Sequence, residues 1–366
     1  MDPAHSSQPG AWPARGEGPR EQVRPGLVWP VRRDKAGVDG PTPWQARGPE
    51  WRATSRGLYV PATVDPDLVE QRIVEAAAVE PSCAVVTGWA ALRWWGGAWF
   101  EGLAADGRTP LPVPLAAGDG HARRTQDDVF EMVWEFVSPK HLTRRDGLRL
   151  TTRLWSVTLA MRRARDLGGA VRIFDMAAYN DLVSIPEVVA FAEEHQGTRT
   201  GVELVREAMV YADENAWSPT EVDFRMVWQL VAGLPRPVCN RPVFDLNGQL
   251  VGTPDLLDPV HGVAGDYDGA LHLEGAQRSR DVAREADFRS VGLEPVTMLA
   301  GDRHDPTEVV RRLHAAYRRA RAKPLSDRRW TIEPPRWWTR TDTVARRRAL
   351  TLEQRRRYLR LRRQAA

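Results

Sequence analysis

Residues 265–272 read GDYDGALH and place two carboxylates, Asp266 and Asp268, two positions apart. On a β-strand, side chains two residues apart point to the same face, so these two carboxylates would lie side by side. Adjacent like charges repel each other, which makes such a pair costly unless a partner compensates it. The stretch therefore indicates either a metal site or an acidic turn, and the residues around it bear on the choice.

The segments around this stretch follow the order helix, three strands, helix, strand, helix. Pro219 suits the first position of the first helix, and Asn247-Gly248 suits a tight turn between the first two strands. The elements are expected over residues 218–235 (helix), 242–257 (hairpin), 261–269 (third strand), 278–292 (helix), 294–301 (strand) and 306–322 (helix). This alternation predicts a mixed sheet with helices on both faces, and therefore an α/β (α+β) fold class.

A third carboxylate, Asp255, falls near the end of the second predicted strand. If the second and third strands are neighbours, Asp255 and Asp266 meet at one edge of the sheet. Hard divalent cations such as Mg²⁺ or Mn²⁺ take oxygen ligands, with one or two carboxylates completed by water and phosphate. Asp255 and Asp266 are therefore the candidate metal ligands, and a bound cation would offset the cost of bringing them together.

Glu221 and His272 are candidates for a supporting role beside these ligands, and each has a structural alternative. Ser218-Pro219-Thr220-Glu221 has the spacing of a capping box, so Glu221 either satisfies a backbone N–H group or reaches the metal. His272 follows Asp268 by four residues and either orients and activates a water molecule or is a packed or surface histidine. Both interpretations of each residue remain open from the sequence.

An EF-hand loop is the rival metal-binding interpretation of the spacing between Asp266 and Asp268. It is excluded because the glycine of the loop comes too early and because Gln277 occupies the twelfth position. The two cysteines, Cys83 and Cys239, provide neither a disulfide framework nor a paired zinc knuckle.

Residues 215–320 resemble the Vsr-like branch of the PD-(D/E)xK endonuclease superfamily. The matching stretches, in the order of that branch, are SPTE, TPDLLDP, DYDGALH, SRDVAR and EPVTMLAGD. The resemblance implies a restriction-endonuclease-like mixed sheet, Asp255 and Asp266 as metal ligands, and Asp268, His272 and Glu221 in support. Asp266 stands where the family has glutamate, which shortens the reach of the carboxylate by roughly 1.5 Å, and the superfamily lysine is absent.

Residues 26–197 resemble the AbiEi-like antitoxin region that precedes this nuclease fold in proteins of actinobacterial type. RGLYVPA is similar to the wing of a winged helix, although an ordinary surface hairpin accounts for it equally well. The expected domains are a disordered segment (1–25), a reduced winged-helix-like segment (26–64), an α+β middle domain (65–197), the nuclease-fold domain (198–322) and a basic C-terminal tail (323–366).

The chain has 366 residues and a net charge of only +4, from 52 basic and 48 acidic residues. Its basic residues gather toward the C-terminus, in residues 311–330 and 344–366, which favours DNA as a partner. No apolar run reaches membrane-spanning length and no apolar signal segment opens the sequence, so no membrane partner and a cytoplasmic location are expected. Residues 351–363 are expected to form a solvated helix, because arginines cover nearly every face of it.

Two functions of different classes follow from these observations. The first is a metal-dependent DNA endonuclease that hydrolyses phosphodiester bonds at Asp255 and Asp266. The second is a DNA-binding transcriptional regulator of antitoxin type, with a nuclease fold that does not cut DNA and with residues 40–62 as its DNA contact. An interaction module in a toxin–antitoxin or defence operon is a third alternative.

Overall fold

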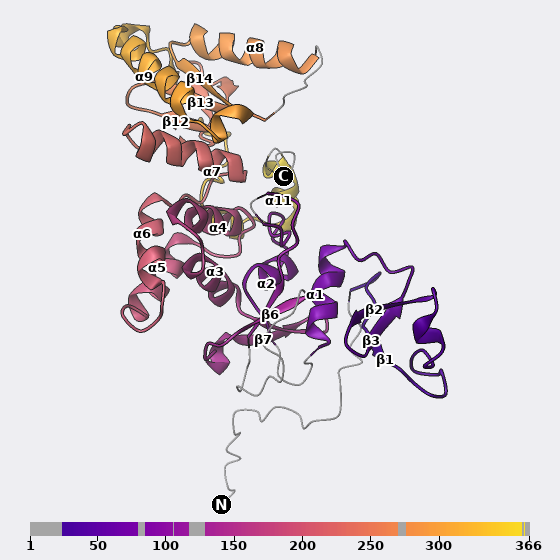
Figure 1. Cartoon of the computed structure of the whole chain (residues 1–366). Coiled ribbons are helices and arrows are strands. Elements are labelled where there is room, and N and C mark those ends of the chain that lie inside the picture. The colour runs from indigo at the N-terminus through magenta and orange to yellow at the C-terminus, as the bar shows by residue number, and fades with distance from the viewer. Residues whose placement is uncertain are drawn as a thin grey trace, which may run out of the picture. The chain divides into compact units, whose positions relative to one another are not determined.

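The computed structural model describes residues 24–79, 85–104, 106–116, 129–269, 276–360 and 362, and it divides into two compact units (Figure 1). Unit 1 comprises the described residues up to Trp94 and those of Phe100–Trp155, and unit 2 comprises Trp95–Trp99 and the described residues from Ser156 onward. Most of the segment 1–25, as well as Cys83 and His272, lies outside the described residues.

The division between the two units falls at residues 155–156, whereas the sequence placed a domain boundary near residue 197. The helices before residue 197 belong to unit 2 because α4 (Leu167–Tyr179) packs on α6 (Val202–Tyr211) and on α7 (Pro219–Met226). Two more helices complete this region, α3 (Arg153–Arg162) and α5 (Ile185–Glu194). The helical part of the predicted middle domain therefore supports the C-terminal sheet.

The first sheet of unit 1 is small and antiparallel, with the strand order β1-β3-β2. It contains β1 (Val31–Arg32), β2 (Trp51–Ser55) and β3 (Leu58–Pro61), with the 3₁₀ helix η1 (Gln45–Arg47) before β2. Gly57 takes a φ of +80° in the turn between β2 and β3, a conformation that favours glycine. Residues 26–64 therefore contain a short helix followed by a hairpin, and their role as a DNA-binding wing remains a prediction.

The second sheet of unit 1 is mixed and has the order β6-β5-β4-β8-β7. Its strands are β4 (Val85–Val86), β5 (Val113–Ala116), β6 (Phe130–Val133), β7 (Leu142–Arg145) and β8 (Leu148–Thr151). The helices of this region are α1 (Val69–Ala77), α2 (Gly88–Trp94) and the 3₁₀ helix η2 (Pro139–His141). Val85, Leu115 and Leu150 are fully buried on its central strands and form its core.

The main sheet of unit 2 has the order β14-β13-β12-β9. Its strands are β9 (Val238–Cys239), β12 (Leu256–Asp258), β13 (Val263–Asp268) and β14 (Glu294–Leu299). β13 and β14 are parallel, with Asp266 opposite Thr297, and the other two pairs are antiparallel. The mixed sheet predicted from the sequence is therefore present.

Helices cover both faces of this sheet, with α8 (Ala276–Ser290) and α7 on opposite sides (Figure 1). On the α8 side, Phe288 packs in a buried cluster with Leu257 and Ala264. On the α7 side, the aromatic rings of Phe224 and Trp228 lie over Gly265, where a Cβ atom would come within 2.8 Å and 2.9 Å of them. The α+β fold class is therefore confirmed, and glycine at position 265 permits the close contact between helix and sheet.

Trp228 belongs to a π-helical turn, η3 (Val227–Val231), that continues α7. Its indole donates a hydrogen bond to the hydroxyl of Tyr317 on α9 (Thr307–Ala322), at 3.2 Å, and α9 also packs on β14. The 3₁₀ helix η4 (Ala300–Arg303) joins β14 to α9. Gly233, with a φ of +62°, follows the π turn and ends the helix two residues before the expected limit at residue 235.

The predicted hairpin is present, but its second strand is divided between two sheets. β10 (Val243–Asp245) and β11 (Leu250–Gly252) pair across the Asn247-Gly248 turn, and β15 (Trp330–Thr331) pairs on the other side of β10. The chain then leaves this sheet at Thr253 and enters β12 at Leu256. Asp255 therefore immediately precedes a strand, where the sequence had placed it near the end of one.

The predicted basic tail belongs to unit 2 and packs on its helices through residues outside α11 (Leu352–Tyr358), whereas α11 itself has no buried residue, as expected for a solvated helix. It contains β15, the 3₁₀ helix η5 (Leu325–Asp327), α10 (Val344–Arg348) and α11. Arg347 is fully inaccessible to solvent and Arg362 is 4% exposed. Their guanidinium groups are hydrogen-bonded to residues on other elements, which allows arginines to be buried. None of the helices that the structure describes has the length and apolar character needed to cross a membrane.

Candidate functional site: an acidic cluster at the ends of β12 and β13

The structure brings Asp255 and Asp266 together at the start of β12 and toward the end of β13. The backbone N–H of Asp255 donates to Asp266 Oδ1 at 3.1 Å, and the backbone N–H of Tyr267 donates to Asp255 Oδ2 at 2.7 Å. The antiparallel register of the two strands, with Leu256 opposite Gly265, sets this arrangement. Each carboxylate therefore helps to fix the strand that carries the other.

Glu221 reaches the same region from the first turn of α7, where it is 5% exposed. Its carboxylate accepts hydrogen bonds from the Trp217 backbone N–H at 2.8 Å, from Asn240 Nδ2 at 2.6 Å and from Ser218 Oγ at 3.0 Å. Ser218 is the N-cap, and its hydroxyl also accepts from the Glu221 backbone N–H. Glu221 therefore satisfies a backbone N–H group, that of Trp217 and not that of the N-cap Ser218, and it also anchors the segment that contains Asn240.

The three carboxylates interact electrostatically, because Glu221 and Asp266 both disfavour a charge on Asp255. Burial, and then the negative charges of Glu221 and Asp266, raise the pKa of Asp255 well above its usual range. Burial likewise raises the pKa of Glu221, although the hydrogen bonds from Trp217, Asn240 and Ser218 oppose the rise. Perturbed carboxyl groups of this kind are concentrated at functional sites.

Arg284 on α8 is a counter-charge to the cluster that the sequence analysis did not assign. Its Nη2 lies 2.8 Å from Asp266 Oδ1 and donates to the carbonyl oxygen of Thr253 at 2.5 Å. Arg284 is the last residue of the SRDVAR stretch, so this motif could have identified it as a candidate site residue. Asn240 was missed as well, because nothing in its local sequence distinguishes it.

The other two predicted site residues are Asp268 and His272. Asp268 ends β13 opposite Leu299, two residues after Asp266 on the same strand. His272 lies outside the described residues, so its proposed role has no structural test. Within the described ranges, no three or more His, Cys, Asp and Glu side chains are grouped in a way that could by itself hold a metal ion.

The basic helix α9 carries arginines in ion pairs and two others, Arg318 and Arg321, that form no ion pair with any residue the structure describes. Arg311, Arg312 and Arg319 form ion pairs with Glu308, Asp302 and Glu294, respectively.

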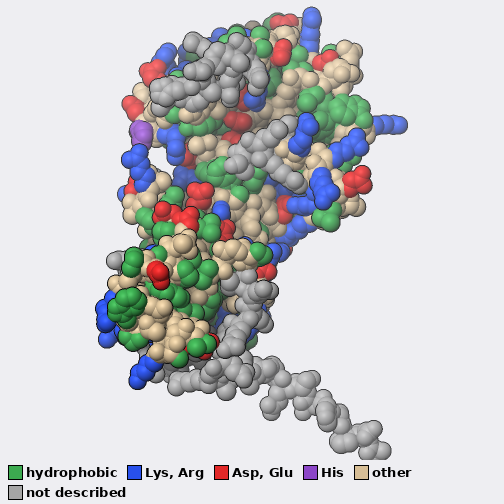
Figure 2. Space-filling view, turned by 90° about the vertical axis from the view of Figure 1, so that its right-hand side faces the viewer, with side chains coloured by type: hydrophobic (Ala, Val, Ile, Leu, Met, Phe, Trp, Pro, Cys, Tyr) green, Lys and Arg blue, Asp and Glu red, His purple; other side chains and the backbone are tan. Residues whose placement is uncertain are grey.

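On the face drawn in Figure 2, Lys and Arg side chains are mixed with Asp and Glu side chains over the upper part of the view. The surface there is therefore mixed in charge.

No family model, no curated protein and no solved structure that was compared with this chain matches it.

Proposed function

We propose that the protein is a metal-dependent DNA endonuclease that hydrolyses phosphodiester bonds at the acidic cluster. The observation that carries this proposal is the linked pair of Asp255 and Asp266 at the ends of adjacent strands, with Glu221 close enough to raise the pKa of Asp255. A mixed sheet between two layers of helices, as the resemblance to the Vsr-like nucleases implies, supports the same proposal.

The donors at this position suit Mg²⁺ or Mn²⁺, with Asp255 and Asp266 as the ligands. Asp255 Oδ1 accepts no hydrogen bond from any residue that the structure describes, whereas Asp255 Oδ2 is taken by Tyr267. A site with only two carboxylates is ordinary for Mg²⁺, which retains several water molecules. A bound divalent cation would neutralise charge on the phosphate and lower the pKa of a coordinated water molecule.

The protein side chains have distinct tasks in this proposal. Arg284 holds Asp266 in place and offsets part of the negative charge of the cluster. Glu221 fixes the Trp217 and Asn240 segments, so it is a positioning residue, and Asp268 and His272 are assigned supporting roles. Arg318 and Arg321 on α9 are available for the DNA backbone, which would make binding weaken steeply as the salt concentration rises.

A cleavage assay on single-stranded, duplex and mismatched DNA with Mg²⁺ or Mn²⁺ tests the proposal. Asp255→Asn keeps the shape and the acceptor for Tyr267 but removes the charge, so cleavage is expected to fall at least about 100-fold, as for the loss of a principal electrostatic group. Asp287→Asn changes an exposed carboxylate on α8 and is the matched control. Equal activity of the two variants, or wild-type cleavage that persists in EDTA, would contradict the proposal.

The second candidate function is a DNA-binding regulator whose nuclease fold does not cut DNA. The Glu221 oxygens already accept hydrogen bonds and Asp266 is already paired with Arg284, which favours a site that binds no metal ion. The exposed surface of residues 40–62 in unit 1 favours DNA binding there. Trp44, just before η1, is 78% exposed, and Arg47 in η1 and Arg56 in the hairpin turn are also exposed. Under this proposal, Trp44→Ala and Arg56→Ala weaken DNA binding measured in EDTA, and Asp255→Asn leaves it unchanged.

A further inference from the structure

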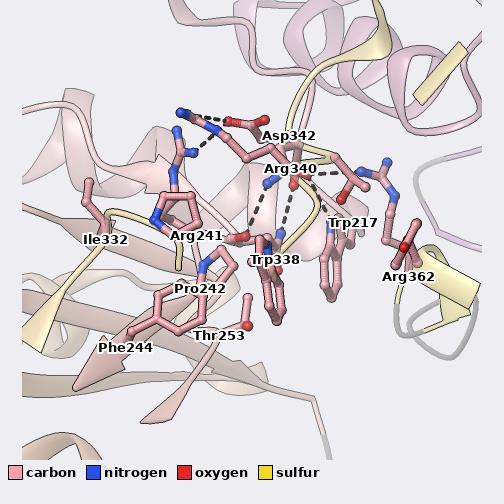
Figure 3. A pocket seen from close by; sticks show the side chains of 15 residues that line it. Trp217, Arg241, Pro242, Phe244, Thr253, Ile332, Trp338, Arg340, Asp342 and Arg362 are labelled. Carbon is pink, nitrogen blue, oxygen red and sulfur yellow. Dashed lines mark hydrogen bonds and ion pairs between the residues drawn. The ribbon is translucent and has the colours of Figure 1, made fainter. Parts of the chain in front are cut away.

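A pocket opens beside the acidic cluster, and residues of the C-terminal segment 332–362 form much of its wall (Figure 3). Its aromatic lining consists of Trp217, Phe244, Trp338 and Tyr358. Its charged lining consists of Arg241, Arg340, Arg362 and Asp342. The C-terminal segment lies outside the stretch that resembles the Vsr-like nucleases, so the resemblance does not assign this pocket.

Two hydrogen bonds connect the pocket wall with the acidic cluster. Asn240, which lines the pocket, donates from Nδ2 to Glu221 Oε2 at 2.6 Å. Thr253, on the same wall, accepts at its carbonyl oxygen from Arg284, which is paired with Asp266. The pocket wall is therefore joined to Glu221 through the side chain of Asn240, and to Asp266 through the side chain of Arg284.

The aromatic side chains of the pocket provide faces for stacking. Trp338 makes an edge contact with Phe244, with ring centroids 5.2 Å apart, and both Trp338 and Trp217 are partly exposed. In the view of Figure 3, Trp338 lies between Phe244 and Trp217. Indole rings stack on any nucleobase, and such stacking contributes about 1–3 kcal/mol per base.

The charged lining is held in place and leaves an excess of positive charge. Asp342 accepts from Arg241 Nη1 at 2.6 Å and from Arg340 Nη2 at 3.2 Å. Arg362 donates to Asn215 Oδ1 at 3.0 Å. Asp342 is the one carboxylate among the described lining residues, against three arginines, so the pocket favours an anionic ligand.

One polar atom of this wall lacks a partner. The Nε atom of Arg241 is buried and donates to no acceptor among the residues that the structure describes. Because this atom is closed to solvent, Arg241 contributes positive charge to the pocket wall and no hydrogen bond from Nε to a ligand. Aromatic faces and positive charge together describe a site for a planar heterocycle that carries a phosphate group.

We propose that this pocket binds one unstacked nucleobase of a DNA strand and so positions the neighbouring phosphate at the acidic cluster. This inference rests on the proposed nuclease function, because it names the substrate group that is recognised next to the scissile bond. It predicts that the substrate is single-stranded at this position, or that one nucleotide leaves the duplex stack.

Equilibrium binding in EDTA tests the inference without cleavage. The probes are a short oligothymidylate and a sugar–phosphate chain of the same length without bases. Trp338→Ala is expected to weaken oligothymidylate binding by about 5- to 150-fold, the range given by the loss of one stacked base. The affinity for the chain without bases should not change. Trp134→Ala is the control, because Trp134 is 55% exposed and does not line the pocket.

Trp338→Phe keeps an aromatic face and should retain most of the affinity, which separates stacking from a loss of folding. Equal weakening of both probes by Trp338→Ala, or no weakening of either, would overturn the inference. The two proposals fail in different ways. Base-dependent binding without cleavage in Mg²⁺ or Mn²⁺ would refute the nuclease alone, and cleavage that is insensitive to Trp338→Ala would refute the base pocket alone.

Discussion

Arg347 and Asp181 form a buried ion pair between α10 and the turn that follows α4, with Arg347 Nε 2.6 Å from Asp181 Oδ1. The same guanidinium donates to the carbonyl oxygens of Thr341 at 3.0 Å and Ala178 at 2.7 Å. The second oxygen of Asp181 accepts from Arg355 at 2.5 Å. These contacts attach the C-terminal segment to the helical layer and explain how an arginine-rich sequence packs instead of extending into solvent.

Replacement of Arg347 by alanine should destabilise unit 2 strongly. It leaves Asp181 Oδ1 and two backbone carbonyl groups without their donor while Arg355 still pairs with Asp181 Oδ2, so the cost should lie near the lower end of the range of about 3–5 kcal/mol for breaking a buried pair. Arg356→Ala, at an exposed position of α11, should change stability by less than about 0.5 kcal/mol. The urea midpoint measured by circular dichroism checks this, and equal midpoints for the two variants would contradict the packed arrangement.

Gly265→Ala should also destabilise the sheet, although it adds only one methyl group. The new Cβ atom would meet Phe224 at 2.8 Å and Trp228 at 2.9 Å, and overpacking of this kind costs about 1–3 kcal/mol. Gly301→Ala is the control, since no atom lies within 4 Å of the added methyl group. Thermal unfolding of the two variants checks the expectation, which fails if Gly265→Ala melts no lower than Gly301→Ala.

Asp342 should make stability depend on pH under acidic conditions. Burial alone would raise the pKa of Asp342, but the hydrogen bond from Arg346 and the charges of Arg241, Arg346 and Arg340 lower it from 3.8 to about 2. Because the folded pKa is depressed, Asp342 stabilises the protein above pH 4 and loses this contribution as the pH falls toward 2. With allowance for screening, the contribution is about 1–2 kcal/mol.

The variant Asp342→Asn lacks this titrating group and provides the comparison. Its urea midpoint should lie below that of the wild type at pH 7, and the gap should narrow as the pH falls below 4. A gap that stays constant from pH 7 to pH 3 would show that Asp342 does not titrate with a lowered pKa.

Asp255→Asn should raise the stability of the metal-free protein while removing its response to metal. Burial and the charges of Glu221 and Asp266 disfavour the ionised form of Asp255, so the neutral amide relieves this repulsion. A gain of 1 kcal/mol would raise Tm by about 2–4 °C in a domain of this size. The melting temperature in EDTA and in MnCl₂ measures both effects. A lower Tm in EDTA, or the same rise with Mn²⁺ as in the wild type, would contradict the prediction.

Local signals in the sequence predicted those parts of the fold that depend on local interactions. Ser218 and Pro219 begin α7, Gly292 with a φ of +99° follows α8, and Asn247-Gly248 forms the hairpin turn. The proximity of Asp255 and Asp266 was also predictable, because a short connection joins two antiparallel strands and so limits their register.

Long-range interactions were not predictable in the same way. The division between β11 and β12 depends on β15, which follows some eighty residues later and pairs with β10. The burial of Arg347 depends on Asp181, 166 positions earlier in the chain. A helical pattern with arginines on every face indicates a solvated helix, which holds for α11, but it does not reveal that Arg347 and Arg362 outside α11 are buried by distant partners. The pocket was not predictable either, because residues 215–253 form one part of its wall and the distant residues 332–362 form the other.

The pairing of β10 with β15 has a consequence for the order of folding during synthesis. Phe244 and Asp245 reach the ribosomal exit well before Thr331 and Trp330, their partners in the sheet. Until those partners emerge, one edge of β10 presents unpaired N–H and C=O groups, which are a template for pairing with another chain. A nascent chain arrested between β14 and β15 would therefore be prone to aggregation and a natural client for chaperones, whereas one that has passed residue 362 can close this edge and complete the pocket beside it.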